Sequence, residues 1–254
     1  MKIAGLDIEM LSLGDGPPLL FLHAGEYFEQ CLPWLKTLSS TYNVIAPRHP
    51  GFGKSALPKD FRSVDDLCYF YLCLMKELDL HDVTLVGSSF GGWIALEIGV
   101  RDLSRLKAVV LLDSLGVKLC EPNEREIADI YATNEDDLIK LTFADPGNGS
   151  LKVDMLTDEE LSIVARDRES TAMFGWKPYM HNPVLSRWLH RVEVPTLVIW
   201  GDRDGIVTPK YGERLAHKLP NAHFRTIAGA GHYPQIERPI EVVSAIEEFI
   251  SDVR

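Results

Sequence analysis

The chain has 254 residues, of which 46% are hydrophobic and 25% charged, and its formal net charge is −11. This composition excludes a disordered chain, and the acidic balance leaves no broad positive field that would attract nucleic acid or an anionic membrane surface. No apolar run is long enough to cross a bilayer and no secretion signal is evident, so we expect a cytoplasmic protein with a small-molecule substrate and with neither nucleic acid nor a membrane as a partner.

The first half of the chain alternates predicted strands with predicted helices. Apolar runs bounded by turn formers predict strands at 6–13, 18–22, 43–46, 83–87 and 108–112, and helical spacing predicts helices at 30–40 and 63–79. The run at 19–22 is apolar throughout, which is typical of a central strand that is buried on both faces of a parallel sheet. We therefore predict an α/β fold with a mostly parallel sheet and helices on both faces.

The pattern changes between residues 116 and 190, where no strand-like run occurs and apolar residues fall at helical spacing. We predict an inserted helical segment in two parts, separated by the turn-rich stretch 144–149, while residues 1–115 and 191–254 form the core domain. The segment is rich in aromatic residues. Any one of these aromatic residues is expected to pack in the core, but some members of the set should face the cleft. The candidates for substrate binding are Phe143, Trp176 and Tyr179.

The sheet resumes after the insertion. Strands are predicted at 195–200 and 222–227, with a helix at 209–218 between them and a closing helix after residue 232. In a parallel sheet the loops that follow the strands gather at its carboxyl edge, where ligands bind. The residues directly after each predicted strand are therefore the place to look for a functional site.

Residues 87–91 read Gly-Ser-Ser-Phe-Gly, which fits the G-x-S-x-G nucleophile elbow between a strand and a helix. In this motif a sharp turn holds the serine Oγ clear of the sheet at a helix N-terminus. The flanking glycines let the strand and the helix approach closely. Ser89 is therefore the candidate nucleophile, although a serine that opens a helix is also a common N-cap.

A serine hydroxyl needs a histidine that accepts its proton and an acid that fixes the tautomer of that histidine. His232 is the best placed histidine, because it lies in a glycine-rich loop directly after the last predicted strand. Three aspartates follow predicted strands. Asp202 comes early in its loop and is expected to bond the turn or pair with Arg203, whereas Asp204 is preferred to Asp113 on the chain order Ser, acid, His of elbow-bearing enzymes.

Other ligand sites are disfavoured by the sequence. The segment Gly53-Lys54-Ser55 ends like a phosphate loop, but Arg48 stands where the first glycine is required. No pair of histidines shows metal-ligand spacing with a nearby acid, so we predict no metal and no cofactor. His23, after the strand predicted at 18–22, is expected to brace a loop that supplies an oxyanion-hole amide.

These motifs resemble those of the α/β-hydrolase superfamily over essentially the whole chain. The resemblance rests on His-Ala-Gly at 23–25, on 50–55, on 87–92, on 201–209 and on 229–239. It implies a capped serine hydrolase in which Ser89, His232 and Asp204 form the triad and the insertion at 116–190 is a helical cap. It also implies an oxyanion hole made by the main-chain N–H groups of Phe90 and Gly25, although Ala24 replaces the usual glycine after the histidine.

Within the superfamily the chain looks most like capped esterases and carbon–carbon bond hydrolases of aromatic ring-fission products. The latter usually carry Asn before the serine and Trp after the histidine, where this chain has Ser88 and Tyr233. We therefore expect hydrolysis of a small carboxylic ester through an acyl-enzyme, with a 2-hydroxy-6-oxo-dienoate as the alternative substrate. Arg166 and Arg168 are candidates to bind a substrate carboxylate, although solvated helix charges are more usual.

An alternative of another class stays open. Some members of this superfamily are small-molecule receptors that turn over their ligand slowly or not at all, and a fold by itself does not decide between the two. Nothing in the sequence indicates the oligomeric state, the acyl and alcohol portions of the substrate, or which residues of the cap line its pocket.

Overall fold

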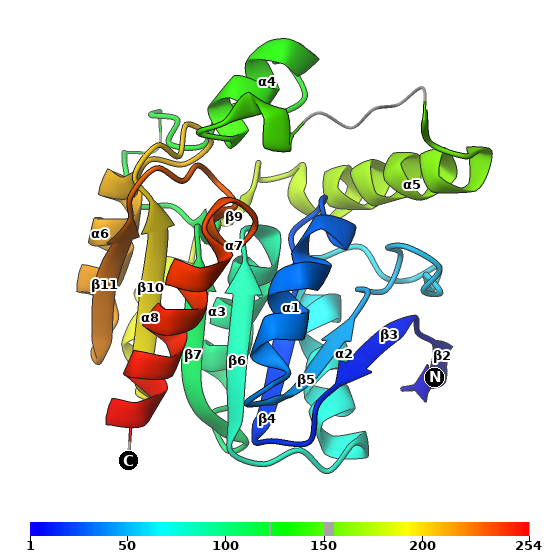
Figure 1. Ribbon diagram of the computed structural model, residues 1–254, viewed down its shortest axis with the longest axis vertical. Coiled ribbons are helices and arrows are strands. Elements are labelled where there is room, and N and C mark those ends of the chain that lie inside the picture. Colours follow the sequence, from blue (N-terminus) through cyan, green and yellow to red (C-terminus); the bar gives the residue numbers. More distant parts are fainter. Residues whose placement is uncertain (122, 150–154, 254) are drawn as a thin grey trace.

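The computed structural model describes residues 1–121, 123–149 and 155–253. Its centre is a seven-stranded sheet in the order β11-β10-β7-β6-β4-β5-β3 (Figure 1). β3 pairs with β5 antiparallel, and the other neighbours pair in parallel. The strands are β3 (Met10–Leu13), β4 (Pro18–Leu22), β5 (Asn43–Pro47), β6 (Val83–Ser88), β7 (Leu106–Leu112), β10 (Thr196–Gly201) and β11 (Ala222–Ile227). The predicted α/β fold is confirmed.

The continuous apolar run of β4 serves two cores. Leu20 and Leu22 pack into the core on one face of the sheet, and Leu19 and Phe21 pack into the core on the other. Helices α2 (Val64–Glu77), α3 (Phe90–Arg101) and α6 (Pro209–Lys218) cover the first face, while α1 (Leu32–Leu38) and α8 (Pro239–Asp252) cover the second (Figure 1). Burial on both faces explains why β4 shows no polar alternation.

The remaining short elements connect this framework. β1 (Lys2–Ile3) and β2 (Leu6–Asp7) form an antiparallel pair. The strand predicted at 6–13 is therefore two strands, β2 and β3. η1 (Glu29–Cys31) precedes α1, η4 (Leu185–Arg187) and η5 (Leu189–Arg191) precede β10, and α7 (Pro234–Glu237) precedes α8. Within the described residues, no helix combines the length and the apolar character that crossing a membrane requires.

The predicted insertion lies over the carboxyl ends of the strands (Figure 1). It contains α4 (Glu135–Thr142), η2 (Pro146–Asn148) and α5 (Asp158–Gly175), so the two helical parts flank the predicted break at 144–149. The expectation that it contains no strand is wrong, because β8 (Gly116–Val117) pairs in parallel with β9 (His181–Asn182). Residues 122 and 150–154 of the predicted cap lie outside the described residues.

The start of α3 packs against the end of β4 without room for a side chain. A Cβ on Gly91 would lie 2.0 Å from the carbonyl oxygen of Leu22, and a Cβ on Gly87 would lie 2.5 Å from the carbonyl oxygen of Gly91. Both contacts are with backbone, which cannot move aside as a flexible side chain can. The two glycines therefore fix the position of Ser89 relative to the loop after β4.

We predict that Gly91→Ala lowers the free energy of unfolding by about 3 kcal/mol, because the added methyl group overlaps backbone atoms. Gly99→Ala, in the same helix, is the matched control. Its Cβ would meet only the side chain of Val192, at 3.2 Å, and the gain in helix propensity of about 1 kcal/mol offsets that contact. Urea unfolding of both variants measures the difference, and equal stabilities would contradict the close-packing argument.

Candidate active site

Ser89 occupies a strained turn between β6 and α3. Its φ of 51° and ψ of −112° lie outside the regions that residues with a Cβ favour. Its N–H donates to the carbonyl of Leu112 at 2.8 Å, and its own carbonyl accepts the N–H groups of Gly92 and Leu115 at 3.0 and 3.1 Å. These hydrogen bonds hold the backbone in a geometry that it would not adopt by itself.

The structure brings together Ser89, His232 and Asp204. Nε2 of His232 lies 2.8 Å from Oγ of Ser89, and Nδ1 of His232 lies 2.8 Å from Oδ2 of Asp204. All three residues are buried, with exposed fractions of 5%, 2% and 4%. Because Nδ1 faces a carboxylate, it carries the proton that it donates to Asp204, and Nε2 is the acceptor for the serine hydroxyl.

Backbone groups fix the acid and the histidine. Oδ1 of Asp204 accepts the N–H groups of Ile206 and Val207 at 2.8 and 3.1 Å, which leaves Oδ2 for the imidazole. The N–H of His232 donates to the carbonyl of Thr142, at the end of α4, at 2.7 Å. The insertion therefore takes part in positioning the histidine.

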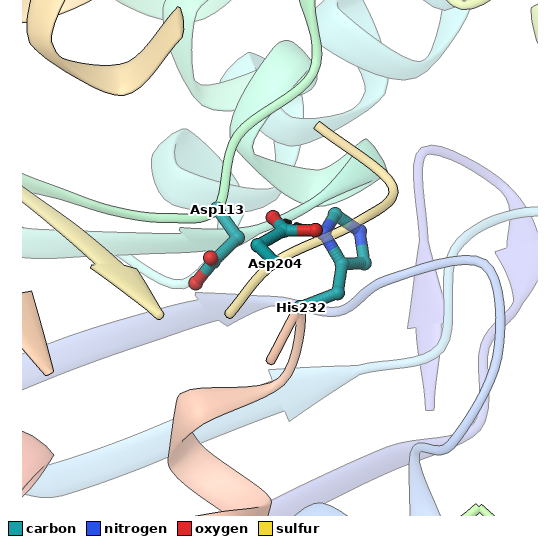
Figure 2. A group of neighbouring side chains, drawn as sticks. All are labelled: Asp113, Asp204 and His232. Atoms are coloured by element: carbon teal, nitrogen blue, oxygen red, sulfur yellow. Dashed lines mark hydrogen bonds and ion pairs between the residues drawn. The ribbon is translucent and has the colours of Figure 1, made fainter. Parts of the chain in front are cut away.

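The other aspartates of the sequence analysis lie differently. Oδ1 of Asp202 accepts the N–H of Gly229 at 2.7 Å, so this side chain bonds the turn. Asp113 lies beside Asp204, where its Oδ1 accepts the N–H of Gly201 at 2.9 Å (Figure 2). Asp113, Asp204 and His232 present potential metal-ligand atoms within 4.8 Å of one another. However, both ring nitrogens of His232 are hydrogen-bonded, Nδ1 to Asp204 and Nε2 to Ser89, so these atoms form a hydrogen-bonded chain and give no ground for a metal site.

Glu237 also positions the histidine loop. This buried carboxylate accepts the N–H of Gly231 at 2.6 Å through Oε2 and the N–H of Asp145 at 2.8 Å through Oε1. It thus ties the residue before His232 to the segment after α4. Glu237 belongs to the motif at 229–239, but a sequence motif does not show which loop its carboxylate reaches.

The two predicted oxyanion-hole residues flank Ser89. Phe90 is the first residue of α3, and Gly25 lies in the loop after β4; both line the cavity that contains Ser89. Among the described residues, neither main-chain N–H donates to a protein acceptor. Two free amides beside a nucleophile are what binding of an oxyanion requires, and their role stays a prediction.

A cavity of about 360 Å³ opens onto Ser89 and His232. Aliphatic side chains form part of its wall: Leu115, Ile127, Ile130, Leu138, Met180 and Ile206. Polar side chains form another part: Glu26, Tyr27, Tyr131, Glu135, Arg168 and Tyr233. The site therefore suits a molecule with an apolar portion and a few polar groups.

The two arginines of α5 have different environments. Arg168 lines the cavity, and its Nε donates to Oε1 of Glu26 at 2.9 Å, so it is not merely a solvated helix charge. Arg166 donates to the carbonyls of Gly53 and Ser55 at 3.0 and 2.6 Å. Arg166 thus binds the core and is not available for a substrate carboxylate.

Phe143, Trp176 and Tyr179, the candidates for substrate binding, are not among the residues that line this cavity. Phe143 is buried against Tyr27 and Tyr233, Trp176 is 59% exposed, and the hydroxyl of Tyr179 bonds the backbone of Ala128 and Ile130. Their aromatic character was the only sequence signal, and it does not say which face of the insertion meets the cleft. Phe143 and Tyr179 instead support residues that do line the cavity.

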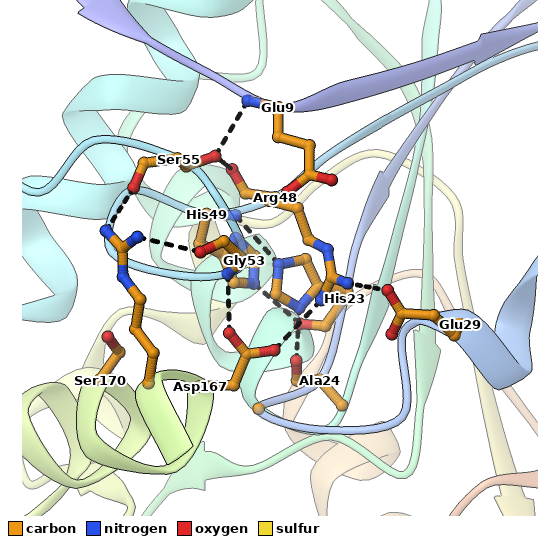
Figure 3. A network of polar contacts seen from close by, with 12 residues as sticks. Glu9, His23, Ala24, Glu29, Arg48, His49, Gly53, Ser55, Asp167 and Ser170 are labelled. Carbon is orange, nitrogen blue, oxygen red and sulfur yellow. Dashed lines mark hydrogen bonds and ion pairs between the residues drawn. The ribbon is translucent and has the colours of Figure 1, made fainter. Parts of the chain in front are cut away.

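A buried polar network joins α5 to the loops after β4 and β5 (Figure 3). Asp167 accepts the N–H of Gly53 at 2.7 Å and the Nη1 of Arg48 at 3.1 Å, and Ser170 donates to the carbonyl of Gly51 at 2.7 Å. Thr171, one helical turn after Asp167, packs tightly on Gly25: a Cβ on Gly25 would lie 2.4 Å from Oγ1 of Thr171. α5 therefore holds the loop that carries the Gly25 amide.

His23 and His49 form the inner part of this network. Their rings stack with centroids 3.7 Å apart, and Nε2 of His23 accepts the N–H of His49 at 2.9 Å. Burial lowers the pKa of His23 well below its usual value and that of His49 to about 3. Both rings are therefore neutral, and His23 braces the loop.

Comparisons with known proteins identify the family and the fold of the chain. The model of a family described as "Alpha/beta hydrolase family" matches residues 19–246. The 2-hydroxymuconate semialdehyde hydrolase of Pseudomonas putida is 28% identical over 98% of this chain and 92% of its own length. Among solved structures, a membrane phospholipase A has a TM-score of 0.82 at 23% identity, covering 100% of this chain and 85% of its own. A thermophilic esterase from Thermogutta terrifontis has a TM-score of 0.79 at 23% identity, covering 100% of this chain and 98% of its own.

We predict that the titration of Asp167 makes the free energy of unfolding depend on pH. Burial raises the pKa of Asp167 from 3.8 to about 6, although the hydrogen bond from the Gly53 N–H and the positive charge of Arg48 lower it. Between these values the unfolded chain releases the proton while the folded protein keeps it, so the free energy of unfolding falls as pH rises. Relative to Asp167→Asn, the wild type should lose about 2 kcal/mol from pH 4 to pH 6.

Urea titrations at several pH values test this, with Asp158→Asn as the control because Asp158 is an exposed residue at the start of the same helix. The control should follow the wild type. A pH slope that is the same in the wild type and in Asp167→Asn would show that Asp167 does not hold its proton in the folded protein.

Proposed function

The chain belongs to the alpha/beta hydrolase family, and from this premise we propose that it is a serine hydrolase of small carboxylic esters. The observation that carries the proposal is the continuous hydrogen-bonded chain from Oγ of Ser89 through His232 to Asp204 at the wall of a cavity. In this arrangement the hydroxyl has a base, the base has a fixed tautomer, and the reacting atoms are shielded from water.

The proposed reaction has two halves. Oγ of Ser89 attacks the acyl carbon while Nε2 of His232 takes its proton, and the imidazolium is stabilised by Asp204. The N–H groups of Phe90 and Gly25 receive the negative charge that develops on the carbonyl oxygen; loss of one such donor typically costs about 3 kcal/mol in the barrier. His232 then protonates the leaving alcohol and activates the water that releases the acid from Ser89.

A second candidate is hydrolysis of a carbon–carbon bond in a 2-hydroxy-6-oxo-dienoate. The observation that favours it is Arg168, whose guanidinium lies at the same cavity as Ser89 and would meet a substrate carboxylate. The likeness to 2-hydroxymuconate semialdehyde hydrolase points the same way. Against it, Glu26 already binds Arg168, and Glu135 adds a further negative charge to the cavity wall. An ester without a carboxylate is therefore the first choice.

We predict that Ser89→Ala abolishes steady-state hydrolysis of a short-chain aryl ester, because Ser89 supplies the one hydroxyl bonded to His232 among the described residues. Ser88→Ala is the matched control: its Oγ accepts from Gln235, at 3.0 Å, and does not contact the imidazole. We expect the control to keep turnover within about tenfold of the wild type. Equal activity of wild type and Ser89→Ala would refute the nucleophile. If neither the aryl ester nor a 2-hydroxy-6-oxo-dienoate is turned over, labelling by a serine-directed phosphonate would indicate a working site with another substrate, whereas no labelling would favour the receptor alternative.

Arg168→Gln distinguishes the two substrate classes. If the substrate is an ester without a carboxylate, kcat/KM stays close to the wild-type value. If a dienoate carboxylate binds Arg168, the loss of a charged hydrogen bond of about 1.5–3 kcal/mol lowers kcat/KM about 10- to 150-fold. Arg187→Gln, an exposed residue of the insertion outside the cavity, controls for the lost charge. Preference of the wild type for the dienoate together with this loss would replace the ester proposal.

A further inference from the structure

Asp113 and Asp204 place two buried carboxyl groups beside one imidazole (Figure 2). Asp113 follows β7 and is fully buried. Its Oδ1 accepts the N–H of Gly201, whereas its Oδ2 has no hydrogen-bond donor among the described residues. An ionised carboxylate with a buried, unsatisfied oxygen would be costly. The reaction as proposed above gives Asp113 no task.

The two carboxyl groups differ in how many donors they face. Asp204 accepts the N–H groups of Ile206 and Val207 and the Nδ1–H of His232, while Asp113 accepts only the N–H of Gly201. Donors stabilise the charged form, and two like charges this close in a buried site are not both retained. Burial, and then the charge of Asp204, raise the pKa of Asp113 well above its usual value. The charge therefore belongs on Asp204.

We propose that Asp113 and Asp204 form a carboxyl pair with a single negative charge, in which Asp113 holds a proton on Oδ2 and Asp204 carries the charge that faces His232. The proton makes the otherwise orphaned Oδ2 a donor toward Asp204, one of whose carboxylate oxygens lies within 4.8 Å of a carboxylate oxygen of Asp113. Asp113 is thus a positioning residue that acts through Asp204. The inference rests on the proposed function, because it concerns the acid of the same triad.

The surroundings of Asp113 support a neutral side chain. The titratable groups that face it are Asp204 from the loop after β10, His232 from the loop after β11 and Glu237 from α7. Two of these are acids, and His232 is bonded to Asp204. Glu237 has its own donors, the N–H groups of Gly231 and Asp145. The charged side chains that act most on the ionisation of Asp113 are Asp204 and Glu237, and both raise its pKa.

Infrared spectroscopy tests the proton directly. At neutral pH the wild type should show the carbonyl stretch of a protonated carboxylic acid, and Asp113→Asn should lose it. Asp202→Asn, an exposed aspartate in the loop that carries Asp204, is the matched control and should keep it. If Asp113→Asn does not fold, Asp113→Ser replaces it, since a hydroxyl also donates and cannot ionise in this range. Identical spectra of wild type and the folded Asp113 variant would overturn the proposal.

Kinetics test which carboxyl carries the charge. Asp113→Asn keeps an acceptor for Gly201 and supplies an N–H in place of the O–H, so we expect kcat/KM within about tenfold of the wild type. The acid limb of the pH profile of kcat/KM should lie at the same pH in Asp113→Asn as in the wild type. If Asp113 were ionised in the wild type, its replacement would remove a negative charge near the imidazole and shift that limb downward by about one pH unit or more. Asp204→Asn should lower kcat by about 10⁴-fold. A loss in Asp113→Asn as large as in Asp204→Asn would overturn the assignment.

The two experiments separate the pair from the proposed function. A carboxylic-acid band that depends on Asp113, in a protein that turns over no ester, would support the pair while the ester proposal fails. An active enzyme without that band would leave the serine mechanism in place and overturn the pair alone.

Discussion

The backbone turn at Ser89 is the constraint on which the rest of the site depends. A φ of 51° at a residue with a Cβ costs about 1–3 kcal/mol, and the turn persists because its carbonyl and N–H groups are all bonded to neighbouring backbone. The contact of Gly91 with the carbonyl of Leu22 then sets α3 against the end of β4. This contact brings the amide of Phe90, at the start of the helix, and the loop that carries Gly25 to the same nucleophile.

The insertion is part of the machinery that positions the site. α5 bonds the loop after β5 through Asp167 and packs Thr171 on Gly25, while the carbonyl of Thr142, at the end of α4, accepts the N–H of His232. The neighbouring carbonyl of Leu141 accepts the N–H of Gly205, directly after Asp204. The loops after β4, β10 and β11 line the cavity, and their positions depend on contacts with two helices of the insertion.

Buried acids in this protein are distinguished by the donors they meet. Asp204 and Glu237 each accept several N–H groups, and Asp167 accepts a backbone N–H and an arginine. Asp113 has one donor and an acidic neighbour. The protein interior stabilises a charge only where hydrogen-bond donors or an opposite charge compensate for lost water. The negative charge is therefore kept on Asp204, which faces the imidazole of His232.

Local signals in the sequence are enough to predict the sheet, the elbow and the order of Ser89, Asp204 and His232: unbroken apolar runs indicate the strands, and glycines at fixed offsets indicate the elbow. The helix at 209–218 and the strand at 222–227 have their predicted bounds for the same reason. The lining of the cavity, in contrast, depends on contacts between distant parts of the chain. Tyr131 and Arg168 reach it, and Trp176 does not, through long-range packing of the insertion on the core, for which the spacing of aromatic residues carries no information. The two-residue pair β8 and β9 and the contact of Asp113 with Asp204 likewise join segments far apart in the chain, so no local pattern could reveal them.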